Sequence, residues 1–222
     1  MIFKFVFWSS KLLLRKLIHF DFLKTNIQFN FILVLALVLL SGCSLKKNTW
    51  STRTYHSINT RFNVYFNGIT SYNEGLTNIS NSNKDDYSAI INMYPISKHE
   101  NASSASSNMD RAIEKSRKAI KLHSIKQKPE RNAKKWNNPE YKVWYNQPEF
   151  NPALKEAWLL LGKSEFHKGD FIGAVGTFSY LSRYYSSDKE MVARCQLWLT
   201  RSYAEMNWIY EAEEMLTNIK QD

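Results

Sequence analysis

The chain has 222 residues, a length that allows one or two domains. Hydrophobic residues make up 44% of it and aromatic residues 14%, which is sufficient for a packed core and excludes a chain too polar to fold. The formal net charge of +10 predicts attraction to acidic partners or surfaces.

A short apolar segment, Phe31–Leu40, has about the length of a signal-peptide hydrophobic region and is too short to span a membrane. It leads into Ser41, Gly42 and Cys43. The two small residues suit a protease pocket, and Cys43 supplies the only nucleophilic thiol there. A buried cysteine after a core helix is the alternative interpretation. The segment resembles the lipobox of bacterial lipoproteins, which implies that residues 1–42 are a signal peptide and that Cys43 is lipidated after cleavage.

The residues before the lipobox set expectations for the precursor and for its charge. Because Met1–Asn30 is long for the region that precedes such a hydrophobic segment, we expect translation to start near Leu23. Removing residues 1–42 takes away five Lys or Arg and one acidic residue, so the formal charge falls from +10 to +6. In an exported protein this balance favours anionic lipid headgroups, glycans or acidic proteins as partners and does not indicate nucleic acid.

Residues 43–49 are a short polar tether. Ser44 stands where an Asp retains enterobacterial lipoproteins in the inner membrane. Lys46 and Lys47 stand where acidic residues mark surface export in Bacteroidetes. The resemblance to these lipoproteins implies an outer-membrane protein that faces the periplasm.

From Trp50 to Ile79 the apolar residues keep spacings of three and four, which predicts helix. Asn67 and Gly68 predict an interruption, so we expect residues 50–96 to form a helical hairpin region. His56 is a lone imidazole in this region and is expected to be structural. Residues 97–108 are rich in Ser and nearly free of apolar side chains, which predicts a flexible loop.

Residues 109–150 combine a basic helix with a long loop. Met109–Lys126 keeps helical periodicity behind a predicted N-cap at Asn108. Between Arg111 and Lys135 there are ten Lys or Arg against two acidic residues. A solvated face and an electrostatic patch for an acidic partner or a membrane surface are both compatible with this run.

The loop Lys128–Gln147 contains two prolines and four large aromatic residues. We expect it to wrap across the helices and bury its rings against them. An aromatic platform for a sugar ring is the alternative. The four rings belong to Trp136, Tyr141, Trp144 and Tyr145.

Residues 151–222 predict two consecutive helical hairpins. The helices are expected at Pro152–His167, Phe171–Tyr184, Lys189–Met206 and Trp208–Lys220. Predicted helix caps separate them: Asn151, Asp170 and Asp188 are suitable N-caps, and Gly169 is a suitable helix stop.

The first hairpin carries a set of signature positions, and Gly162 and Ala174 would let its two helices approach closely. A weaker copy follows 38 residues later at Leu199, Asn207, Ala212 and Leu216. The pattern resembles the tetratricopeptide repeat. The resemblance implies an all-α fold, a tetratricopeptide-repeat-like α-solenoid of stacked helical hairpins, and we expect the array to be truncated after Asp222. The signature positions are Trp158, Leu161, Gly162, Gly169, Phe171, Ala174 and Phe178.

Residue patterns for catalysis or metal binding are missing from the sequence. It has no Gly-rich phosphate loop, zinc-ligand spacing or nucleophile elbow, and its five histidines lack close partners in sequence. We therefore predict a non-enzymatic protein without cofactor or metal. Cys195 lies on the apolar face of its predicted helix and is expected to be a buried free thiol.

Repeats of this kind offer a concave surface, and the resemblance implies which first-helix positions face it. Lys163 and Arg201 occupy matching positions in the two repeats and are candidates for holding a carboxylate. A solvated face is the alternative. The partner-binding candidates are Leu159, Lys163, Phe166, His167, Leu197 and Arg201, and the other groove positions are Glu156, Arg194, Ala204 and Glu205.

Three segments carry a more specific resemblance: Arg61–Gly68, Met109–Ser116 and Asn151–Phe171. They are similar to Bacteroidetes outer-membrane lipoproteins of the SprE and PorW group, associated with type IX secretion and gliding motility. The resemblance implies a periplasm-facing scaffold that binds envelope proteins. An outer-membrane assembly lipoprotein and a SusD-like glycan-binding lipoprotein are the alternatives.

Overall fold

The structure is a computed structural model that describes residues 47–92, 94–97 and 99–221, without the side chains of His99 and residues 218–221. The predicted signal peptide and Cys43 lie outside these residues. Leu45–Asp222 forms a compact unit of its own.

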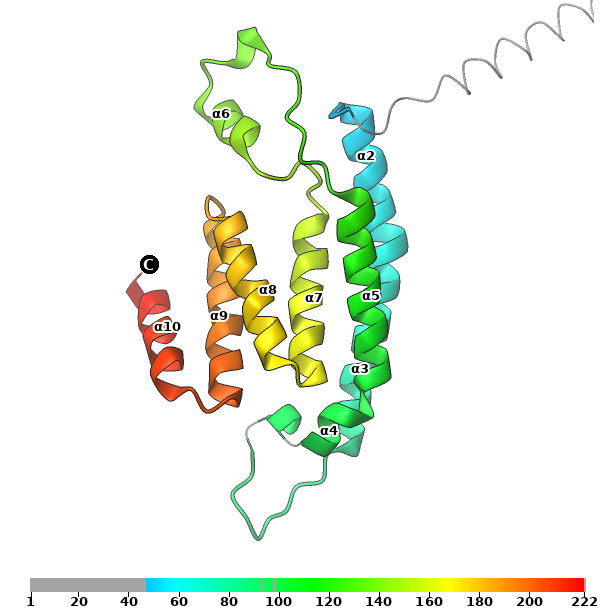
Figure 1. The fold of residues 1–222 in the computed structure, drawn as a ribbon, viewed down its shortest axis with the longest axis vertical. Helices are drawn as coiled ribbons and strands as arrows, with labels where there is room; N and C mark the ends of the chain where they lie inside the picture. The colour runs from blue at the N-terminus through cyan, green and yellow to red at the C-terminus, as the bar shows by residue number, and fades with distance from the viewer. Residues whose placement is uncertain (1–46, 93, 98, 222) are drawn as a thin grey trace, which may run out of the picture. The chain divides into compact units, whose positions relative to one another are not determined.

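All secondary structure in the described ranges is helical (Figure 1), which confirms the all-α prediction for this part of the chain. The elements are α2 (Trp50–Asn59), the π-helix η1 (Thr60–Tyr65), α3 (Phe66–Ser82), η2 (Pro95–Ser97), α4 (His99–Ser104), α5 (Ser106–His123), η3 (Ala133–Lys135), α6 (Pro139–Asn146), α7 (Leu154–Lys168), α8 (Phe171–Tyr184), α9 (Lys189–Glu205) and α10 (Ile209–Gln221).

The first long helix runs without a turn through α2, η1 and α3, so the expected interruption at Asn67 and Gly68 is wrong. A Cβ at Gly68 would lie 3.1 Å from Leu160 Cδ2 and 3.3 Å from Lys115 Cβ. The glycine therefore serves close packing of α3 against α5 and α7, not a change of chain direction. Residues 50–96 contain one long helical arm, and α5 packs against it as the second arm.

The expected flexible loop at 97–108 is also wrong, because α4 and the first residues of α5 occupy most of it. Its alanines are buried rather than solvated, with Ala102 and Ala105 in the same core cluster as Met109. A Cβ at Gly75 of α3 would lie 2.6 Å from Met109 Cε and 3.5 Å from Ala105 Cβ. Small residues on both helices thus let α3 and α5 pack closely. Residues 97–108 have few large apolar side chains, but their small alanines are buried all the same.

The four C-terminal helices follow the sequence prediction to within two residues at each end. Asp170 accepts a hydrogen bond from Gly173 N at 2.9 Å, and Asp188 accepts one from Met191 N at 3.2 Å. Gly169 ends α7 with φ of 90°, a conformation that glycine adopts without steric cost. The predicted N-cap at Asn151 is wrong, because α7 begins at Leu154 behind Ala153, which makes no side-chain cap hydrogen bond. Asn151 Oδ1 accepts from Ala153 N at 3.1 Å in the turn that precedes the helix.

The core runs between successive helices, with α5 against α7, α7 against α8, α8 against α9 and α9 against α10 (Figure 1). Gly162 lies under the ring of Phe178, where an added Cβ would come within 2.6 Å of Cζ. Cys195 is a fully buried free thiol, as predicted, and burial raises its pKa to about 11.

The aromatic loop does not wrap across the helices, contrary to the prediction. Together with α6 it lies beyond one end of α5 and α7 (Figure 1). Its rings pack mainly on one another: Trp136 lies edge-on to Tyr145 at 5.5 Å between centroids, and Tyr141 lies 5.5 Å from Trp144. The loop thus has a small aromatic core of its own.

Candidate functional site

Three of the residues expected to line an open groove are buried. Leu159, Phe166 and His167 are inaccessible or nearly so, and the prediction that they face a groove is wrong. The reason is that α7 has neighbours on both sides. Tyr72 of α3 lies edge-on to His167, and Trp198 of α9 lies edge-on to Phe166, so side chains of adjacent helices fill this face.

The two matching cations, Lys163 and Arg201, do lie together, on the ring of Trp198. Lys163 Nζ lies 5.4 Å from the centroid of this ring, and Arg201 Cζ lies 4.9 Å from it. The side chain of Leu197, four residues before Arg201, is exposed. Burial, followed by the charge of Arg194, lowers the pKa of Lys163. In the part of the chain that the structure describes, neither cation has a carboxylate within ion-pair distance. Partner binding by Lys163, Leu197 and Arg201 stays a prediction.

The chain itself covers part of this face. The Tyr94 ring lies 4.1 Å from Arg201 Cζ, and Ser97 Oγ donates to Glu205 Oε1 at 3.0 Å. Two of the other groove positions, Glu156 and Arg194, pair with each other through two hydrogen bonds of 2.8 and 3.1 Å. This pair joins α7 to α9, so both side chains are used between these two helices.

An exposed apolar row follows the first long helix. From Tyr55 onward its large side chains keep spacings of three and four residues into the π-helical turn, whose wider winding holds them on one face, and Trp50 lies five residues before Tyr55. Residues with such side chains rarely gather in water on a monomer. The row contains Trp50 (73% exposed), Tyr55 (48%), Ile58 (52%), Phe62 (70%) and Phe66 (60%).

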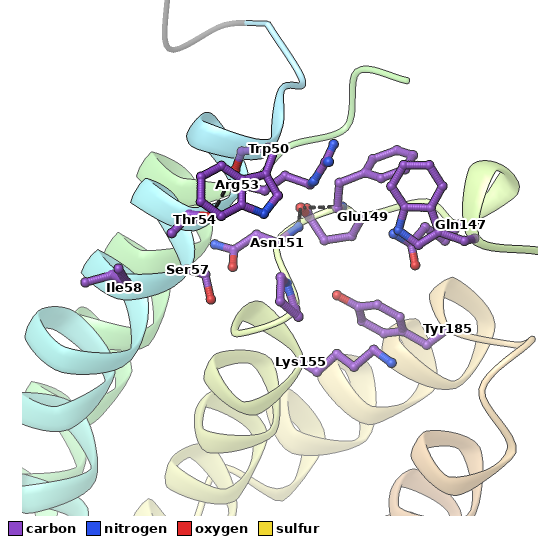
Figure 2. A pocket seen from close by; sticks show the side chains of 13 residues that line it. Trp50, Arg53, Thr54, Ser57, Ile58, Gln147, Glu149, Asn151, Lys155 and Tyr185 are labelled. Atoms are coloured by element: carbon purple, nitrogen blue, oxygen red, sulfur yellow. Dashed lines mark hydrogen bonds between the residues drawn. The ribbon is translucent and has the colours of Figure 1, made fainter. Parts of the chain in front are cut away.

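The N-terminal end of the apolar row borders a pocket of about 420 Å³ (Figure 2). Trp50 and Ile58 line it from α2, Lys155 from α7, and Tyr185 from the end of α8. The Tyr185 hydroxyl points toward the pocket in Figure 2 and is buried, with no hydrogen-bond partner among the described residues. Burial, with Glu149 nearby, raises the pKa of Tyr185, so the hydroxyl stays protonated and can donate.

Glu149 organises the wall of this pocket, and sequence reasoning missed it. Its buried carboxylate accepts hydrogen bonds from Ser124 Oγ at 2.5 Å and from three backbone amides, those of Ile125 (2.7 Å), Phe150 (3.0 Å) and Asn151 (2.9 Å). Asn151 Nδ2 then donates to Thr60 Oγ1 at 3.0 Å. The only signal in the sequence was the place of Glu149, an acidic residue two positions before the Asn151-Pro152 pair that precedes α7.

The histidines also differ from expectation. His56 is not alone, because its Nδ1 lies 2.9 Å from Nδ1 of His123 across α2 and α5. Burial, followed by repulsion from His56, lowers the pKa of His123.

Within residues 47–92, 94–97 and 99–221, no three or more His, Cys, Asp or Glu side chains gather as metal ligands would. In the same ranges, no helix has both the length and the apolar character needed to cross a membrane.

The basic stretch divides into two parts. Along α5, Arg117 pairs with Glu165 of α7 at 3.1 Å, and Lys115 lies 3.6 Å from Glu114. Beyond α5, four cations lie near aromatic rings and two, Lys134 and Lys135, are exposed to solvent.

Comparison with protein-family models finds no match for this chain, and comparison with curated proteins finds no significant relative.

Proposed function

We propose that this protein is a non-enzymatic scaffold, lipid-anchored at Cys43 in the outer membrane, that faces the periplasm and binds an envelope protein of the type IX secretion or gliding-motility machinery. We also propose that its helices are tetratricopeptide-repeat-like hairpins. The signature positions of the sequence support this fold, as does the packing of each helix against the next from α7 to α10.

The observation that carries the proposed function is the exposed apolar row with its pocket. A row of large side chains on one helix face is suited to an apolar helix or extended segment of a protein partner. One partner side chain would enter the pocket beside Trp50 and Ile58.

A crosslinking pull-down of the full chain from native envelopes tests this proposal. Phe62→Ser together with Phe66→Ser removes the centre of the row. Ile172→Ser together with Tyr210→Ser removes two large side chains elsewhere that are at least as exposed, and is the matched control. We expect the wild type and the control to recover a secretion or motility component, and the row variant to lose about tenfold or more of it. Recovery of a barrel-assembly complex, or of no envelope protein, would contradict the proposal.

The anchor has a separate test. Cells that express the full chain are fed a fatty acid carrying an alkyne, and label on the protein is measured. We expect label on the wild type and none on Cys43→Ala. Equal labelling of both, or of neither, would show that Cys43 is not the lipid attachment site.

A further inference from the structure

A second surface, which we name the basic loop surface, lies where the chain enters α2. It consists of the tether end, Arg53 in the first turn of α2, and the loop that carries α6. Between residues 126 and 142 there are six Lys or Arg and two Glu, a formal charge of +4. Its cations are Lys47, Arg53, Lys126, Lys128, Arg131, Lys134, Lys135 and Lys142.

Hydrogen bonds hold the loop and the tether end together as one surface. Asn48 Nδ2 donates to the backbone oxygen of Gln127 at 2.6 Å, and Arg53 donates to Asn48 Oδ1 at 2.6 Å. Arg53 Cζ also lies 5.3 Å from the centroid of Trp144. The position of the loop is therefore fixed relative to Lys47, the first described residue of the chain.

The aromatic rings support the cations. Arg131 Cζ lies 3.9 Å over Trp136, and Lys128 Nζ lies 5.1 Å from the centroid of Tyr145. These contacts and the ring-to-ring packing occupy faces that a sugar ring would need for stacking, which argues against a glycan platform. Val143 on α6 stays 64% exposed.

The positive charge of this surface is not balanced within the described residues. None of its cations has a carboxylate within 4 Å there, whereas Lys155, Lys168 and Arg194 elsewhere are each paired with one. Unpaired cations beside amphipathic rings form the composition that contacts anionic lipid headgroups.

We propose that the basic loop surface contacts the anionic headgroups of the bilayer that carries the lipid anchor. This inference rests on the proposed function for the presence of that bilayer. Cys43 precedes Lys47 by four residues, and four extended residues reach about 14 Å at most. A lipidated Cys43 would thus keep Lys47, and the loop bonded to its neighbour Asn48, close enough to the bilayer for this surface to reach the headgroups. Contact there would fix the orientation of the helices relative to the membrane.

The test uses residues 45–222, the compact unit that excludes the signal region. Co-sedimentation is measured with vesicles of phosphatidylcholine alone and with vesicles that also contain phosphatidylglycerol. We expect binding only to the anionic vesicles, lost at high salt. Lys134→Glu with Lys135→Glu should weaken it about tenfold or more. Arg111→Glu with Lys118→Glu makes the same charge change on α5 and should leave binding within about twofold.

Equal binding to both vesicles, equal loss in both variants, or no vesicle binding would overturn the inference. Binding to heparin or an acidic peptide without vesicle binding would assign the surface to an acidic polymer and also overturn it. Because residues 45–222 carry no lipid, this result is independent of the labelling of Cys43. Failure of the anchor and failure of the headgroup contact are therefore distinguishable.

Discussion

His167 provides a quantitative test of the packing between α3, α7 and α9. Its imidazole is 7% exposed. Its Nδ1 donates to the backbone oxygen of Lys163 at 2.9 Å and lies 3.3 Å from the hydroxyl oxygen of Tyr72. Burial lowers its pKa to about 4, and the charges of Arg201 and Lys163 act in the same direction.

The sign and the size of the effect follow from this pKa. In the unfolded chain the pKa of a histidine is about 6.5, so between pH 6.5 and 4 the unfolded state binds the proton more tightly. The stabilising contribution is present in full above pH 6.5 and is lost as the pH falls to about 4. Each pKa unit corresponds to about 1.4 kcal/mol, so the complete loss is about 3 kcal/mol, of which about 2 kcal/mol is lost by pH 5.

Urea denaturation of residues 45–222 at pH 7.5 and pH 5 measures this contribution. His167→Gln removes the titrating group and should reduce the difference in unfolding free energy between the two pH values by about 2 kcal/mol. Ser164→Ala, a buried change on the same helix, should alter stability but not that difference. The pKa of His123 is also lowered, so some pH dependence of stability remains in His167→Gln. The measured quantity is therefore the difference in pH dependence between the wild type and this variant. An unchanged pH dependence in His167→Gln would refute the reasoning.

Three further predictions concern stability, each checked by urea denaturation at pH 7.5. Glu149→Gln should cost about 2 kcal/mol or more, because an amide cannot accept from all four donors around it; a change below about 0.5 kcal/mol would contradict the role assigned to this carboxylate. Gly162→Ala should cost about 1 to 3 kcal/mol, because its Cβ would press on Phe178. Gly176→Ala on α8, with nothing near its Cβ, should be neutral or stabilising, and equal costs at both glycines would argue against close packing as the cause. Gly169→Ala should cost about 1 kcal/mol, because φ of 90° strains any residue with a Cβ, and full stability would mean that α7 ends differently.

The sequence alone determined the helices of residues 151–221 and the caps at Gly169, Asp170 and Asp188. Local chemistry decides these features, since Asp170 and Asp188 accept amide hydrogen bonds within their own turns and Gly169 adopts a conformation set by its lack of a Cβ. The buried state of Cys195 was also predictable, because its place on an apolar helix face is a property of spacing.

Only the tertiary structure decided the rest. Gly68 was interpreted as a turn, but its meaning depends on Leu160 and Lys115, which approach from other helices. Phe166 and His167 were assigned to an open groove, yet Tyr72 and Trp198 cover them from neighbouring helices. The pocket wall around Glu149, the histidine pair and the bond from Asn48 to the loop that carries α6 all join residues far apart in sequence. Spacing along one segment carries no information about contacts of this kind.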